Sequence, residues 1–163
     1  MRIIYKIFPL LLLWLIACSN DQEGVDPGKV LGVDMPAPVE IIYYDEFGNN
    51  LLDNKGTQSI NVDNVKIYYL IDNKRLGAGE TKLMYEKGFK VAETLAGKSC
   101  LDVSINLYGN SDKEVTLTLI DFGGENTDTL KTELIRANGS SWLMRIWYND
   151  IEYQRDKPIE VVK

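Results

Sequence analysis

After residue 38, apolar and polar residues alternate with a period of two over most of the chain. Successive side chains of a β-strand point to opposite faces, so this alternation is typical of strands with one buried face. The alternating segments are also rich in the β-branched and aromatic residues that strands favour. The clearest of them are residues 65–71, 101–107, 115–119 and 142–147.

Clusters of Asp, Asn, Gly and Ser separate these segments and predict tight turns. One cluster, at 121–127, should join strands at 114–122 and 127–137 in a hairpin. Short strands at this spacing predict an all-β fold, a single antiparallel, immunoglobulin-like β-sandwich of seven to nine strands over residues 39–163. The other turn clusters lie at residues 45–50, 72–74, 109–112 and 138–141.

Residues 80–97 fit two patterns. A helix ending at Gly97 would place several apolar side chains on one face, but Gly88 in its middle would cost about 1 kcal/mol. Phe89 and Val91 also fit a strand. We expect two short strands here, with a helix as the alternative.

The first 17 residues contain an apolar stretch that follows Arg2 and Lys6 and ends in Leu15-Ile16-Ala17-Cys18. It is shorter than the roughly 20 residues needed to span a membrane, so a cleaved signal peptide fits better than a transmembrane anchor. The tetrapeptide resembles the lipobox of bacterial lipoproteins. The resemblance implies that Cys18 carries diacylglycerol and an N-linked fatty acyl chain and begins the mature chain. Several acyl chains together give stable membrane attachment.

Residues 18–38 combine Gly, Pro and acidic residues, which predicts a flexible tether between the lipid and the domain. Their first part, Ser19-Asn20-Asp21-Gln22-Glu23, resembles the surface-export signal of Bacteroidetes lipoproteins. This resemblance implies an outer-membrane protein that faces the cell surface. An ordinary linker is the alternative.

Charge and composition exclude several function classes. Removal of residues 1–17 takes away Arg2 and Lys6 and no acidic residue, so 16 basic and 24 acidic residues leave a net charge of −8. Nucleic acid is therefore not an expected partner. The chain has no histidine, which removes Ser-His-Asp and Cys-His catalytic sites and most zinc sites. We expect no cofactor besides the covalent lipid. Cys100 has no partner for an intrachain disulfide and fits a small core residue.

Residues 45–54 are dense in side chains that carry oxygen. Calcium takes about six to eight oxygen ligands, so a calcium site is possible, but the spacing departs from the EF-hand loop and turn formation fits better. Within this segment, Phe47-Gly48-Asn49-Asn50-Leu51-Leu52-Asp53 is similar to a motif of small Bacteroidetes lipoproteins. Asn50 stands where that motif has Asp, which weakens any metal site implied by the resemblance.

Aromatic residues near the end of the chain suggest a glycan-binding site. Sugar rings stack on flat aromatic faces, while Asp, Asn and Arg supply hydrogen bonds at the rim. Strict alternation places Trp142, Met144, Ile146 and Tyr148 on one face of a strand, and Arg145 with Trp147 on the other. We expect the first set to face the core, and we name Trp147, Arg145 and Tyr148 as candidate ligand-binding residues. Core packing of Trp147 is the alternative.

Asp128-Thr129-Leu130 resembles the Asp-Ser/Thr-aliphatic sequence at which Bacteroidetes O-glycosylate exported proteins. The resemblance implies that Thr129 carries a glycan. An ordinary strand threonine is the alternative.

Three functions remain open at this point. The first is a non-catalytic, lipid-anchored surface protein that binds a glycan or a partner protein. The second is a structural accessory subunit of an outer-membrane or adhesion assembly, docking by a strand edge or an aromatic patch. The third, which we favour least, is a glycoside hydrolase that uses two carboxylates. Its candidate acids are Asp45, Glu46, Asp53, Asp150 and Glu152.

Overall fold

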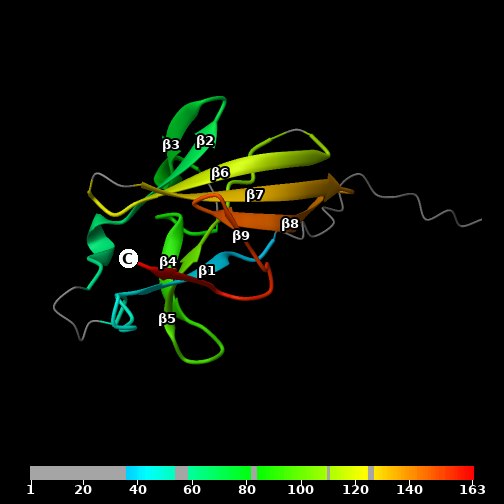
Figure 1. Cartoon of the computed structure of the whole chain (residues 1–163). Helices are drawn as coiled ribbons and strands as arrows, with labels where there is room; N and C mark the ends of the chain where they lie inside the picture. Colours follow the sequence, from blue (N-terminus) through cyan, green and yellow to red (C-terminus); the bar gives the residue numbers. More distant parts are fainter. Residues whose placement is uncertain (1–35, 54–58, 82–83, 110, 125–126) are drawn as a thin grey trace, which may run out of the picture. The chain divides into compact units, whose positions relative to one another are not determined.

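The computed structural model describes residues 36–53, 59–81, 84–109, 111–124 and 127–163. They form ten strands and two short 3-10 turns (Figure 1). The strands are β1 (Val39–Tyr44), β2 (Lys66–Ile71), β3 (Lys74–Gly77), β4 (Phe89–Glu93), β5 (Ser99–Val103), β6 (Lys113–Asp121), β7 (Thr127–Ala137), β8 (Ser140–Tyr148), β9 (Ile151–Tyr153) and β10 (Ile159–Val162); the turns are η1 (Val62–Asn64) and η2 (Ala78–Glu80).

The strands form two sheets. One has four strands in the order β10-β1-β5-β4, and the other has six in the order β3-β2-β6-β7-β8-β9. Seven of the strands reproduce the connectivity of an immunoglobulin sandwich: β1, β5 and β4 take the places of strands B, E and D, and β3, β2, β6 and β7 those of C′, C, F and G. The all-β sandwich prediction is therefore confirmed, with ten strands instead of seven to nine.

The last three strands extend this arrangement. β8 and β9 continue the six-stranded sheet beyond β7, and β10 then pairs with β1 in the other sheet. The β1–β10 pair is parallel, with Ile41 opposite Ile159, whereas every other pair of strands in the described residues is antiparallel. The expectation of a purely antiparallel sandwich is wrong at this edge.

The core lies between the two sheets and receives one face of each. Aliphatic side chains from both sheets are fully buried there, together with three tyrosines, Tyr43, Tyr69 and Tyr148. The six-stranded sheet also turns Thr116 and Thr132 inward, and their hydroxyls hydrogen-bond to each other at 2.8 Å. Because each buried hydroxyl has a partner, these polar residues fit in the core.

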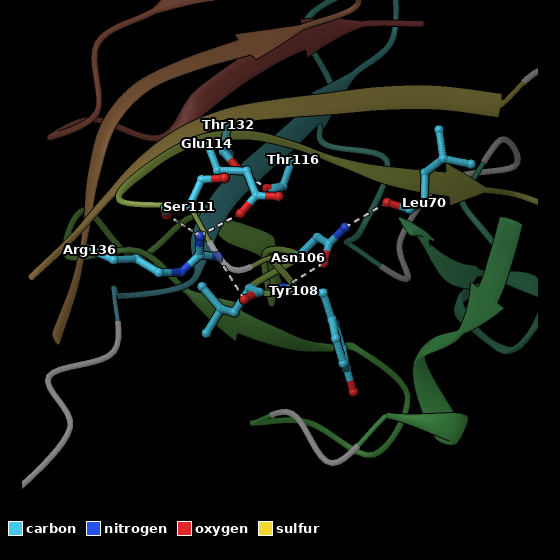
Figure 2. A network of polar contacts seen from close by, with 9 residues as sticks. Leu70, Asn106, Tyr108, Ser111, Glu114, Thr116, Thr132 and Arg136 are labelled. Atoms are coloured by element: carbon cyan, nitrogen blue, oxygen red, sulfur yellow. Dashed lines mark hydrogen bonds and ion pairs between the residues drawn. The ribbon is translucent and has the colours of Figure 1, made fainter. Parts of the chain in front are cut away.

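The segment after β5 leaves the sheet but stays buried, so the strand predicted for residues 101–107 ends at Val103. Figure 2 shows the polar contacts that replace strand pairing. The Asn106 amide donates to the carbonyls of Leu70 and Leu117 at 3.0 and 3.2 Å. Arg136 of β7 donates to the Leu107 carbonyl at 2.8 Å. The side chains of Asn106 and Arg136 thus supply hydrogen bonds to backbone carbonyls in a region where the chain after β5 forms no strand pair.

Residues 80–97 contain one strand instead of two. β4 forms as expected, preceded by the single turn η2 and a loop, and followed by a tight turn at 94–97. Gly88 has a φ of +77° and Gly97 a φ of +73°. The left-handed backbone at Gly88, in the middle of the segment, excludes the continuous helix that was the alternative.

A bulge changes the alternation along β8. Glu133 of β7 pairs with Arg145, but the next residue, Leu134, pairs with Leu143, so Met144 is the additional residue. Because of this extra residue, the side chains on one side of the bulge point to the opposite face from the one that strict alternation predicts. Trp142 is consequently 44% exposed, whereas Ile146 is buried. The prediction that Trp142 faces the core is wrong for this reason.

The signal peptide, Cys18 and almost all of the tether lie outside the described residues. Within the part of the chain that the structure describes, no helix has the length and apolar character needed to cross a membrane.

Candidate functional site: the outer face of the six-stranded sheet

The six-stranded sheet has one face against the core and one outer face directed away from it. Strand register assigns side chains to the outer face, because residues paired across strands lie on the same side. Across the sheet, Leu70 pairs with Leu117, Leu117 with Lys131, Lys131 with Trp147 and Trp147 with Glu152. This row crosses five strands and changes from aliphatic to aromatic and charged.

The β2–β6 half of the outer face is mainly aliphatic. Val115 is 54% exposed, and the remaining apolar side chains of this half are half-buried. They lie in adjacent positions of β2 and β6, so together they form a continuous apolar surface, consisting of Tyr68, Leu70, Val115, Leu117 and Leu119. We call these residues the aliphatic half.

The β7–β9 half combines two tryptophans with four charged side chains. We call this set the tryptophan platform: Trp142, Trp147, Lys131, Glu133, Arg145 and Glu152. The bulge at Met144 places both tryptophans on the same side, since Trp142 pairs with Ile135 and Trp147 with Lys131, two positions of β7 separated by four residues.

Trp147 lies between two cations. The Lys131 ammonium is 4.9 Å and the Arg145 guanidinium 4.7 Å from its ring centroid. Both distances allow cation–π attraction. The indole is half-buried, so its orientation is fixed by its neighbours while part of its surface stays open to solvent.

Glu133 pairs with two cations, Lys113 of β6 and Arg145 of β8. Its side chain is 7% exposed and accepts ion pairs from Lys113 at 2.6 Å and from Arg145 at 3.5 Å. Lys113, with Arg145 as the weaker influence, lowers the pKa of the Glu133 carboxyl below its usual value. Arg145 also donates to both carboxylate oxygens of Glu152, at 3.2 and 3.3 Å. The platform is therefore a connected network of opposite charges around an indole.

The structure brings together two of the three predicted ligand-binding residues. Trp147 and Arg145 lie side by side on the outer face. Tyr148, which is 2% exposed, faces the core instead. Its assignment to the ligand site is wrong because consecutive strand residues point to opposite faces. Sequence reasoning missed Lys131 and Glu133 on the neighbouring strand, and it missed that Trp142 lies on the same face as Trp147.

Tyr148 belongs to a second group of ionisable residues, which we call the buried tyrosine cluster: Tyr43, Tyr148, Asp128 and Lys163. The two tyrosine hydroxyls are 3.1 Å apart and link the two sheets. The Tyr148 hydroxyl donates to Asp128, and the Lys163 ammonium lies 2.6 Å from the same carboxylate. Burial strongly raises the pKa of both tyrosines, so both hydroxyls stay protonated.

The acids considered for a hydrolase lie in two different places. Asp45, Glu46 and Asp53 belong to the loop after β1, whereas Asp150 and Glu152 belong to the β8–β9 hairpin of the other sheet. Most already have partners: Asp53 accepts from Ser99, and Glu152 from Arg145. These contacts give the carboxylates structural roles.

The loop after β1 uses its oxygens to form a turn. The Asp45 carboxylate accepts from the backbone of Phe47 and from both the backbone and side chain of Asn49. The Asn49 side chain in particular lowers the pKa of the Asp45 carboxyl. Among the residues that the structure describes, no group of three or more acidic or cysteine side chains is placed to hold a metal ion.

The structure also places two other residues that the sequence singled out, Cys100 and Thr129. Cys100 is fully buried, and burial raises the pKa of its thiol to about 11, which makes it unreactive. Thr129 lies half-buried in β7, where its backbone exchanges hydrogen bonds with Asn149. O-glycosylation of Thr129 stays a prediction.

Comparisons of the chain with protein-family models, with curated proteins and with solved structures found no match.

Proposed function

We propose that this protein is a non-catalytic, lipid-anchored surface protein that binds a glycan on the tryptophan platform. The observation that carries the proposal is that Trp142, which is 44% exposed, and Trp147, which is half-buried, lie on the same face of the six-stranded sheet with charged side chains between them. Indole rings offer flat apolar surface for sugar rings. Arg145, Lys131 and Glu152 supply donors and acceptors for sugar hydroxyls.

The anchoring part of the proposal comes from the sequence. The lipobox resemblance at Leu15-Ile16-Ala17-Cys18 supports lipid attachment at Cys18, and the acidic residues that follow support display at the outer membrane. The tether of residues 18–38 would separate the domain from the membrane. A platform on a strand face, away from the core, would then be accessible to long polymers.

Affinity electrophoresis of the full chain in detergent tests glycan binding. A polysaccharide in the gel should retard the protein, and Trp147→Ala should reduce the retardation at least tenfold. Leu95→Ala is the matched control, because Leu95 is a fully exposed apolar residue in the β4–β5 turn, outside the platform. If no polysaccharide in a broad panel causes retardation, glycan binding is refuted.

Metabolic labelling tests the anchor separately. Cells given labelled palmitate should incorporate it into this chain, and Cys18→Ala should abolish incorporation and leave the signal peptide attached. A Cys100→Ala variant provides the control, since Cys100 is the other cysteine of the chain. Normal maturation of Cys18→Ala would refute the lipoprotein assignment.

A second function, as an accessory subunit of an outer-membrane assembly, has one observation in its favour. The aliphatic half exposes a continuous apolar surface that sugar binding does not use, and such surfaces occur at protein interfaces. Stoichiometric co-purification of one partner from membranes, lost in Val115→Lys, would support it. Isolation of the wild-type chain as a monomer would count against it.

A further inference from the structure

We infer that the tryptophan platform takes a neutral, linear glycan laid along β8, and does not take acidic polysaccharides. This inference rests on the proposed function and specifies the ligand class of the same site. Two features carry it: the balance of charge around the platform and the separation of the two tryptophans.

The ion pairs of the platform compensate one another. Three cations, Lys113, Lys131 and Arg145, are each within 4 Å of at least one carboxylate. The three carboxylates are those of Glu133, Asp150 and Glu152. Within these ion pairs, positive and negative charges are therefore equal in number.

An acidic sugar would be disfavoured at such a site. Its carboxylate or sulfate would have to replace an existing partner of Arg145 or lie close to Glu152, and like charges at contact distance repel. Sugar hydroxyls have no such conflict, because they can accept from Arg145 and Lys131 and donate to Glu152. Charge balance thus favours a neutral ligand over a uronate or a sulfated sugar.

The spacing of the tryptophans favours a chain of several sugars. On the regular strand β7, their partners Ile135 and Lys131 are four residues apart, which corresponds to about 13 Å at the usual rise of a strand. One sugar ring cannot cover both indoles at that separation. Arg145 pairs with Glu133 midway between them, so a chain stacked on both rings would pass over its guanidinium.

The Trp142 end of this path is not covered by β9. β9 pairs with β8 only from Ile146 to Tyr148, and Trp142 lies beyond that pairing. Trp142 is therefore at the edge of the sheet, where no further strand in the described residues covers it. A polymer could extend past Trp142 at this edge.

Affinity electrophoresis with matched polymers tests the charge argument. The full chain in detergent should be retarded by at least one neutral polymer among β-glucan, xyloglucan, mannan and galactan, and not by polygalacturonate, alginate or heparin. Asp150→Asn removes one carboxylate, the partner of Lys131 at 3.9 Å, without changing side-chain size. Because Asp150 is outside the platform, this variant should keep the neutral binding and gain measurable retardation by polygalacturonate. If an acidic polymer retards the wild-type protein as much as the neutral polymers do, or more, the inference is overturned while glycan binding itself is not.

Calorimetric titration with oligosaccharides of the retarding polymer tests the linear arrangement. Affinity should rise at least tenfold between two and five sugar units, and both Trp142→Ala and Trp147→Ala should remove that rise. If a disaccharide binds as tightly as an oligosaccharide of five units, or if Trp142→Ala leaves the titration unchanged, the two-tryptophan arrangement is overturned. Absence of binding to every polymer would instead refute the proposed function itself.

Discussion

Trp147 and Tyr148 are neighbours in the sequence, yet they belong to two aromatic clusters with opposite properties. The tryptophan platform and the buried tyrosine cluster both combine aromatic rings, carboxylates and a lysine. In the buried cluster, Tyr148, Tyr43 and Asp128 are enclosed between two sheets, and their polar atoms bind one another. On the platform, Arg145 and Glu152 are about half exposed, Glu133 is buried beneath its cationic partners, and part of the Trp147 indole is uncovered.

The difference shows how the same residue types serve stability in one place and recognition in another. An enclosed polar atom must keep its partner, because losing that partner leaves an uncompensated group in a dry interior. Exposed ion pairs contribute little to stability, so they can exchange a partner for a ligand at small cost. The contrast can be tested by paired substitutions in the two clusters.

The largest expected effect is that of removing an aromatic ring from each cluster. Tyr148→Ala should lower the free energy of unfolding by about 3–5 kcal/mol, since it leaves a cavity in the core. Trp147→Ala should lower it by less than about 1 kcal/mol, because the ring is on the outer face. Urea denaturation followed by circular dichroism measures both. Equal losses would contradict the distinction between the clusters.

Removal of a carboxylate should show a smaller contrast. Asp128→Ala deprives Tyr148, Asn149 and Lys163 of their acceptor and should cost about 1–3 kcal/mol of unfolding free energy. Asp150→Ala breaks only a long, exposed pair with Lys131 and should cost less than about 0.5 kcal/mol. The same denaturation experiment compares the two. A larger effect at Asp150 would show that the platform is the more rigid cluster.

The smallest effect concerns pH. Glu133 has a lowered pKa in the folded chain because of Lys113. Its stabilising contribution is therefore present above the usual carboxyl pKa of about 4.3 and is lost as pH falls through the folded value. The melting temperature of the wild type should exceed that of Glu133→Gln at pH 7, and the gap should narrow as the pH falls below about 4.3 and the carboxyl of the folded chain takes up a proton.

Glu46→Gln is the matched control for that measurement, since Glu46 lies in the exposed loop after β1. It should melt with the wild type at both pH values. A Glu133→Gln gap that does not narrow at all as the pH is lowered would indicate that Glu133 acts through packing and not through its charge.

The sequence pattern identified the fold class because strand alternation and turn residues are local signals. The hairpin expected at 114–122 and 127–137 closely matches β6 and β7. The parallel pairing of β10 with β1 had no local signal, because it depends on which strands meet after folding. The early end of β5 had no local signal either. The segment that follows β5 is held by the Asn106 side chain, which donates to the carbonyls of Leu70 and Leu117, residues far away in the sequence or on another strand.

The candidate site was only partly predictable for the same reason. Trp147 and Arg145 lie on one face, as expected, because they are two residues apart on a regular part of β8; their role in ligand binding stays a prediction. Trp142 was assigned to the wrong face because the bulge at Met144 depends on pairing with β7. Lys131 and Glu133 come from the neighbouring strand, so their proximity to Trp147 follows from register, which one isolated strand pattern does not contain.

The pairing of β10 with β1 has a consequence for how the domain is completed during synthesis. Residues 41 and 159 must meet before the four-stranded sheet has its outermost strand, and contacts so distant along the chain form late. A polypeptide that is still being synthesised would expose the bare edge of β1 until β10 arrives. Premature termination before residue 159 should therefore yield aggregates, not a trimmed but working domain.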